Sequence, residues 1–223
     1  SAASDVYKRQ EKFDALMREQ VERAKADARA RRGALADLSV YSEFRAKGET
    51  AFVGYDNLEA TSQVIGIIAD GQSVASAGAG QTVEIMLAET ALYAEAGGQD
   101  ADHGWLRSAT GGFEARVLDV QKPVPGLIAH TVEITDGMIA VDDEVESIVD
   151  AHYRRQASEA HTATHLIHAA LRDTLGPDAH QTGSYNKAGY MRLDFGWSEP
   201  LSAATRSELE EITNGAVRDD FEV

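Results

Sequence analysis

Between residues 50 and 150 the chain alternates short apolar, β-branched runs with turn dipeptides, and this pattern restricts the fold more than any other feature. Residues 64–69 form an apolar run that ends at Asp70-Gly71, and residues 83–87 alternate at a period close to two. Further runs cover residues 113–120, 127–134 and 138–141, with Asp136-Gly137 as a predicted hairpin turn. Several short strands at this spacing predict a small antiparallel β-barrel.

From residue 151 onward the pattern predicts a helix, a strand and a second helix. The first helix covers residues 161–175 and is stopped by Gly176-Pro177. The strand covers residues 190–195, which places Met191, Leu193 and Phe195 on one face. The second helix covers residues 205–217 and begins with a capping box formed by Thr205 and Glu208.

The start of the chain predicts one long helix over residues 11–33, with Gly33 as its C-cap. Residues 1–10 have no apolar periodicity, and we interpret them as a cloning or assembly scar. The predicted organisation is an artefact at 1–10, a helical segment at 11–49, a barrel at 50–150 and a truncated two-layer α/β domain at 151–223. The predicted fold class is α+β.

Two histidines four residues apart, His161 and His165, are the strongest candidates for chemistry. Residues at positions i and i+4 of a helix share one face, so the two imidazoles can point at one metal ion. Zinc in proteins takes three or four ligands, and the sequence contains no cysteine. The pair is therefore interpreted as half of a zinc site, to be completed by other histidines, by carboxylates or by residues outside this chain.

The same residues allow other interpretations. His161, His165 and His168 also suit the polar edge of an amphipathic helix. A zinc protease is disfavoured, because its HExxH motif needs a glutamate between the histidines and this chain has Thr-Ala-Thr there.

Composition excludes several classes of protein. The formal net charge of −16 argues against a surface dedicated to nucleic acid, because phosphate binding depends on Lys and Arg. A basic excess at residues 18–32 suits either an ordinary solvated helix face or an RNA contact. The absence of cysteine excludes disulfides and fits a cytoplasmic location, and no apolar run is long enough to span a membrane.

The segment HTATHLIHAALRDTLGPDAHQTGSYNKAGYMRLDF resembles the opening of the editing domain of the alanyl-tRNA synthetase family. The stretches FVGYDNLEATSQVIGIIADG and IMLAETALYAEAGGQDADHGWL resemble the β-barrel domain that precedes this editing domain. EKFDALMREQVERAKADARA resembles the helix that leads out of the tRNA-binding region. The resemblance covers residues 11–223 in family order and implies that the chain is an internal fragment.

The resemblance implies hydrolysis of serine or glycine mischarged on tRNA(Ala). It makes His161 and His165 the first two zinc ligands, with the others in a Cys-x-x-x-His segment beyond Val223. ATP and Mg²⁺ belong to an aminoacylation domain that precedes the fragment. Thr164 and Gln181 match positions of the editing pocket, with helix packing and a loop hydrogen bond as their alternative roles. His168 is interpreted as structural.

Further alternatives remain open from the sequence. Residues 95–99, Glu-Ala-Gly-Gly-Gln, suit a turn between strands, and the resemblance also implies a role near the tRNA acceptor end. The chain could be a free-standing trans-editing deacylase or a non-catalytic RNA-binding module. In the favoured interpretation the isolated fragment binds zinc weakly and is inactive, because two imidazoles do not close a site.

Overall fold

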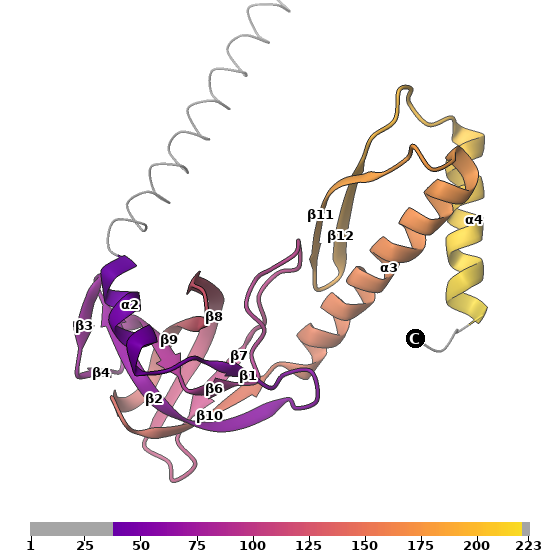
Figure 1. Cartoon of the computed structure of the whole chain (residues 1–223). Coiled ribbons are helices and arrows are strands. Elements are labelled where there is room, and N and C mark those ends of the chain that lie inside the picture. The colour runs from indigo at the N-terminus through magenta and orange to yellow at the C-terminus, as the bar shows by residue number, and fades with distance from the viewer. Residues whose placement is uncertain (1–37, 220–223) are drawn as a thin grey trace, which may run out of the picture.

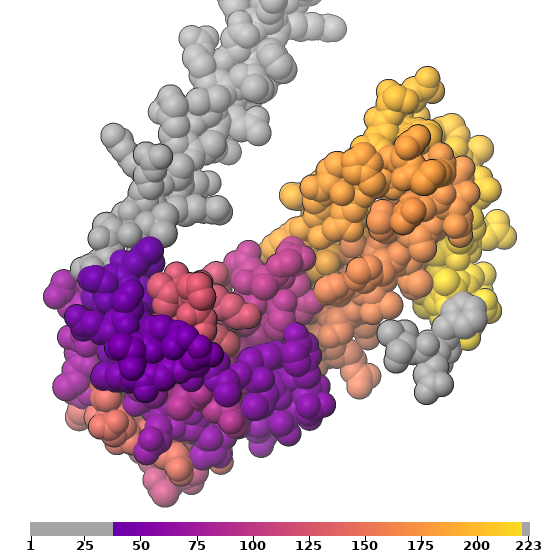
Figure 2. Space-filling model, in the orientation of Figure 1, coloured from indigo at the N-terminus to yellow at the C-terminus, as the bar shows by residue number. Residues whose placement is uncertain are grey.

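The computed structural model describes residues 38–219, which form a β-barrel and a helix–hairpin module (Figure 1). The predicted helix at 11–33, the basic excess at 18–32 and the scar at 1–10 lie outside the described residues. In the space-filling view the two parts are distinct lobes that meet at the first half of helix α3 (Ala151–Leu175) (Figure 2). The predicted α+β class is confirmed.

Within the described residues, six antiparallel strands close the barrel. Their spatial order is β10-β7-β8-β9-β5-β2, and β10 pairs with β2 to complete the circle. The strands are β2 (Glu59–Ala69), β5 (Thr82–Leu87), β7 (Gly104–Arg107), β8 (Phe113–Val124), β9 (Leu127–Ala140) and β10 (Glu144–Val149). Short additions are β1 (Ala51–Phe52), which pairs with β6 (Glu89–Thr90), β3 (Gln72–Val74) beside β2, and β4 (Ser76–Gly78) beside β9.

The barrel is filled by the inward side chains of these strands, as the period-two pattern predicts. Val83, Ile85 and Leu87 on β5 point into this core and are at most 3% exposed. Met86 points outward but is also buried, because helix α2 (Leu38–Lys47) covers that face and places Phe44 against it. The sequence pattern did not predict this second, smaller core.

The helix–hairpin module is built on α3. The hairpin of β11 (Gln181–Lys187) and β12 (Tyr190–Phe195) lies along α3, and α4 (Ala203–Asp219) also packs on it (Figure 1). A third core joins these elements through Leu171, Leu209, Leu193 and neighbouring side chains. Met191, Leu193 and Phe195 alternate with more exposed residues along β12, as predicted.

A predicted turn and a predicted helix cap are wrong. Asp136-Gly137 is not a hairpin turn, because both residues lie inside the long strand β9 and pair with β8. Gly137 has φ +74°, and a Cβ at this position would clash with the carbonyl oxygen of Gly112, so only glycine allows this backbone conformation and the close approach to β8. The last helix begins at Ala203, where Ser202 Oγ accepts a hydrogen bond from Thr205 N (3.0 Å), so the cap lies before the predicted box.

Candidate functional site

Helix α3 carries the histidine pair and starts ten residues earlier than predicted. The side chain of Asp150 caps it by accepting hydrogen bonds from the backbone N–H groups of His152 and Tyr153, both at 3.0 Å. Asp150 directly follows β10, so the barrel wall sets the point at which the helix begins. The first turns of α3 therefore lie against the barrel, and His161 comes shortly after them.

A buried ion pair fixes these first turns. Arg154 Nε lies 2.9 and 3.0 Å from the carboxylate oxygens of Asp102, and its Nη2 also contacts this group. Arg154 further donates to the carbonyl oxygens of Gly54 (2.6 Å) and Ala91 (2.8 Å). Asp102 is 2% exposed, so this pair is largely removed from solvent. The guanidinium thus joins α3 to two loops of the barrel.

The segment Glu95–Gln99, which we call the glycine turn, forms a tight turn that reaches from the barrel to the hairpin. Ala96 and Gln99 exchange backbone hydrogen bonds across the glycines at 3.0 and 3.2 Å. The backbone N–H of Asn186 on β11 donates to the carbonyl of Gly98 (2.7 Å), and Asp100 N donates to the carbonyl of Asn186 (2.9 Å). The close approach that the glycines permit is therefore to β11.

This turn also holds one imidazole of the pair. Nδ1 of His161 lies 2.6 Å from Oε1 of Gln99, and an amide oxygen can only accept, so Nδ1 carries the proton. The lone pair of His161 is consequently on Nε2. The orientation of a metal-binding histidine by a hydrogen bond at its other nitrogen is the usual supporting contact in such sites.

The two ring nitrogens that face each other are Nε2 of His161 and Nε2 of His165, 3.0 Å apart. Two nitrogens bound to one tetrahedral zinc at about 2.0–2.1 Å would lie about 3.3 Å apart, so the pair fits a shared ion with little movement. Without metal, His165 Nε2–H would donate to His161. Metal binding requires His165 to carry its proton on Nδ1 instead, and that exposed ring can do so toward water.

Among residues 38–219 no group of three or more His, Cys, Asp or Glu side chains is arranged to hold a metal ion. The two imidazoles therefore fit half of a zinc site and no more. His168 lies one turn further along α3, and its Nε2 is buried without a hydrogen-bond partner. That nitrogen makes no hydrogen bond to the pair, and the structural role of His168 stays a prediction.

Thr164 and Gln181, the two predicted pocket residues, differ in their surroundings. Thr164 is 3% exposed, and its hydroxyl donates to Oδ1 of Asn186 (2.6 Å). Gln181 begins β11, is exposed, and donates to Oγ of Ser184 (3.0 Å). Thr164 thus lies next to His165 in the helix and is bound to the strand on which the glycine turn docks, whereas the hydrogen bond of Gln181 is to Ser184 and not to the pair.

Sequence reasoning missed Gln99 and Asn186, which connect these parts. The sequence predicts a turn or a contact with the tRNA acceptor end for the segment that contains Gln99, but no contact between Gln99 and the histidines. Asn186 lies in the strand β11, which the apolar pattern does not predict. Asn186 is 2% exposed and uses its side chain for Thr164 and its backbone for the glycine turn. A polar residue between Tyr185 and Lys187 gives no sign of burial, so the sequence alone contained no usable signal.

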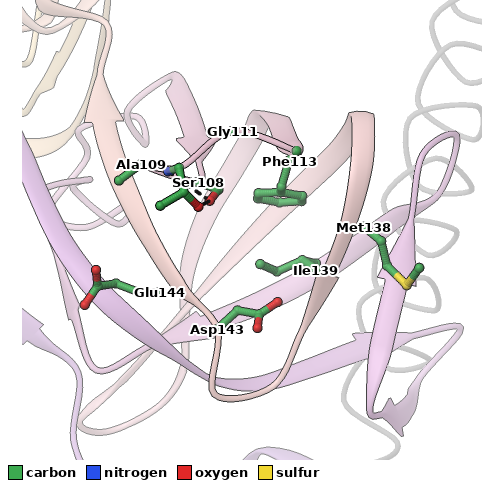
Figure 3. A pocket seen from close by; sticks show the side chains of 10 residues that line it. Ser108, Ala109, Gly111, Phe113, Met138, Ile139, Asp143 and Glu144 are labelled. Atoms are coloured by element: carbon green, nitrogen blue, oxygen red, sulfur yellow. Dashed lines mark hydrogen bonds between the residues drawn. The ribbon is translucent and has the colours of Figure 1, made fainter.

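A groove of about 550 Å³ opens beside His161, between α3 and the loop that follows β1. This volume lies within the range of about 300–1,000 Å³ that is usual for ligand clefts. A second hollow of about 320 Å³ has the glycine-rich turn before β8 on one side and Asp143 and Glu144 on the other (Figure 3). It contains no histidine, so the groove beside His161 is the better candidate.

Two comparisons with known proteins, one with family models and one with curated sequences, point to the same family. Residues 3–153 match the family model of class II (A) tRNA synthetases. The chain is 60% identical over 213 residues to the alanine-tRNA ligase of Clavibacter sepedonicus, which covers 96% of this chain and 24% of the relative. It is 58% identical over 211 residues to that of Leifsonia xyli subsp. xyli, covering 95% and 24%, and 54% identical over 212 residues to that of Cutibacterium acnes, covering 95% and 23%.

The chain thus spans about a quarter of the length of the curated relatives that it matches. The histidine pair lies beyond the segment matched by the family model, in the part of the chain that only the full-length relatives cover. Within the described residues, no helix has the length and apolar character needed to cross a membrane.

Proposed function

Because the chain belongs to the alanyl-tRNA synthetase family within the class II (A) enzymes, we propose that it carries part of a zinc-dependent editing site that hydrolyses seryl- or glycyl-tRNA(Ala). The parent protein would be an alanine-tRNA ligase of the cytoplasm, with ATP and Mg²⁺ in its separate aminoacylation domain. His161 and His165 would supply two zinc ligands, and the remaining ligands would come from outside this chain.

One observation carries this proposal. The Nε2 atoms of His161 and His165 face each other at 3.0 Å, while Gln99 holds the proton of His161 on the far side of the ring. A pair of surface histidines with no ligand to bind would have no need of a barrel loop that sets the tautomer of one ring. The contact with Gln99 leaves Nε2 of His161 without a proton, as a metal ligand needs, and His165 would become the second ligand by moving its proton to Nδ1.

The chemical need for such a site follows from the limits of recognition. A pocket sized for alanine cannot strongly reject glycine, which is smaller, and it discriminates poorly against the one added hydroxyl of serine. A second, hydrolytic site restores accuracy. A bound zinc ion would polarise water or the ester there. Thr164, fixed by Asn186, would place a small polar side chain next to the second ligand.

The two other interpretations are less well supported. A free-standing deacylase would not be expected to match alanine-tRNA ligases at 54–60% identity over nearly the whole chain. A non-catalytic RNA-binding module would not need a preset tautomer at His161.

The test uses a chimera: the Clavibacter sepedonicus ligase with its matching 213 residues replaced by this chain. We expect the chimera to deacylate seryl-tRNA(Ala), and we expect the double variant His161→Ala/His165→Ala to lose this activity. The loss should exceed the roughly 10- to 100-fold that follows when only a group supporting a metal ligand is removed. Deacylation is measured with serine-charged tRNA(Ala), and bound zinc is measured on the same samples.

His152→Ala is the matched control, because His152 is exposed on the same helix and lies outside the pair. It should keep both deacylation and zinc content. Alanine charging, which the replaced segment does not catalyse in this proposal, should survive in every variant and reports on folding. Equal deacylation by the chimera and the double variant would refute the editing role.

A further inference from the structure

The groove beside His161 has an aromatic end that the editing chemistry does not use. Phe52, Tyr55 and Tyr93, whose rings contact one another, line the groove together with Gln99 and His161, which are joined by a hydrogen bond. The aromatic residues come from β1, from the loop after it and from the loop after β6, at the foot of α3 (Figure 1). One continuous hollow therefore joins an aromatic cluster to the histidine pair.

Contacts within the aromatic cluster hold its rings in place, but the ring of Tyr55 is exposed to solvent. The Phe52 ring meets Tyr55 edge-on at 5.0 Å between centroids (81°) and Tyr93 at 5.9 Å (71°). The Tyr93 hydroxyl donates to the carbonyl of Ala96 (3.3 Å), which ties this ring to the glycine turn. Tyr55 is 84% exposed, although backbone hydrogen bonds from Asp56 and Asn57 to Val53 close its loop.

The charges of the groove decide which part of a ligand it could hold. Its cation, Arg154, is already bound by Asp102 and by two carbonyl oxygens, and Asp56 adds a carboxylate. A phosphate would therefore find no free positive group here. An uncharged aromatic ligand suits the site better, because a flat ring can stack on Tyr55 without a counterion.

Building on the editing function proposed above, we propose that this groove binds the unpaired terminal nucleotide of the tRNA 3′ end. Its base stacks on the open face of Tyr55, and its ribose, which carries the ester, extends toward His161. The contact is sequence-tolerant and depends little on salt, because stacking rather than ion pairing supplies it. Tyr55 thereby acts as a positioning residue for the ester.

The experiment compares Tyr55→Ala, Tyr55→Trp and the parent chimera in two assays. In deacylation of seryl-tRNA(Ala), Tyr55→Ala should raise KM about 5- to 100-fold with kcat little changed, and Tyr55→Trp should restore the parent KM. In the second assay the terminal nucleotide of uncharged tRNA(Ala) is 2-aminopurine, whose fluorescence is quenched on stacking. Quenching by the parent and by Tyr55→Trp, with its loss in Tyr55→Ala, is the expected result.

The matched control is Tyr190→Ala, which removes another exposed aromatic ring that does not line the groove. It should behave as the parent in both assays, and alanine charging should be normal in all variants. Parent-like KM and quenching in Tyr55→Ala would overturn the stacking site while leaving the editing function intact. Tyr55-dependent quenching without any deacylation by the chimera would support the base site and refute the editing function alone.

Discussion

His130 on β9 is a fully buried histidine whose two ring nitrogens both have partners. Nδ1 donates to the carbonyl of Ile85 (2.8 Å), and Nε2 lies 2.9 Å from the hydroxyl of Thr90, which donates to it. This arrangement satisfies the neutral ring. Burial lowers the pKa of His130 to about 4, although the contact with Ile85 acts in the opposite direction.

The free energy of unfolding of the barrel should consequently decrease as the pH is lowered, because of His130. The pKa is lower in the folded chain than in the unfolded chain, so the unfolded chain binds more protons below about pH 6.5. The contribution of His130 to the free energy of unfolding is fully present above that pH and declines as the pH falls toward 4. It amounts to about 3 kcal/mol. Urea unfolding at pH 7.5 and pH 4.5 measures it. His130→Gln should flatten this dependence, and an unchanged slope would contradict the assignment.

At the residue scale, the sequence predicts contacts between candidate site residues only where these residues are close together in the chain. The proximity of His161 and His165 follows from the helical repeat, and the structure confirms that they face each other. Gln99 lies 62 residues before His161, and no local pattern predicts a contact over that separation. Roles for Thr164 and Gln181 in a pocket remain predictions.

At the scale of elements, the junction between the barrel and α3 depends on one ion pair. Arg154 is 17% and Asp102 2% exposed, and Asp102 also accepts from the backbone N–H of Tyr93 (2.7 Å). When one partner of such a pair is removed, the other is left as a buried charge without compensation.

We therefore expect Arg154→Met to reduce the free energy of unfolding by about 3–5 kcal/mol. Arg116→Met is the control, since Arg116 and Glu133 form an ion pair in which both side chains are about half exposed. That change should cost less than about 1 kcal/mol. Urea unfolding of both variants at pH 7 provides the comparison, and equal losses would show that the buried pair does not anchor the helix.

Elements with strong apolar periodicity were predicted well, and polar ones were not. β2 ends at Asp70-Gly71 as expected, because both residues adopt the positive φ that a tight hairpin needs (50° and 74°). β11 was missed because its sequence, QTGSYNK, is polar and is covered by α3 on a face that the sequence does not mark. Asp136-Gly137 carried the same turn signal as Asp70-Gly71, but the long pairing of β8 with β9 overrides it.

At the scale of the whole molecule, the glycine turn is a second contact between the barrel and the helix–hairpin module, beside the Arg154–Asp102 ion pair. Gly97 and Gly98 both have positive φ, 61° and 80°. A Cβ on Gly97 would meet nothing within 4 Å, whereas a Cβ on Gly98 would lie 2.5 Å from the carbonyl oxygen of Ser184. A side chain at Gly97 would therefore affect only the backbone conformation of the turn, whereas a side chain at Gly98 would also disturb its docking on β11.

Gly98→Ala should lower deacylation by the chimera about 10- to 100-fold, because the displaced turn no longer lets Gln99 hold His161. Gly97→Ala has the same unfavourable φ, costs about 1–2 kcal/mol of stability, and should keep most of the activity. Deacylation rates and zinc content of the two variants give the test. Similar activity in both would mean that docking on β11 does not orient the histidine.

The hydrogen bond between Gln99 and His161 also has a consequence for the order of events during folding. The two histidines are brought together as soon as one turn of α3 forms, which is a fast and local event. The contact with Gln99 spans 62 residues and needs the barrel loop to be in place, so it forms later. When the whole chain refolds, the two imidazoles are therefore close together before Gln99 orients His161, and a metal ion bound by the proposed pair would meet an oriented ring only after the barrel has closed.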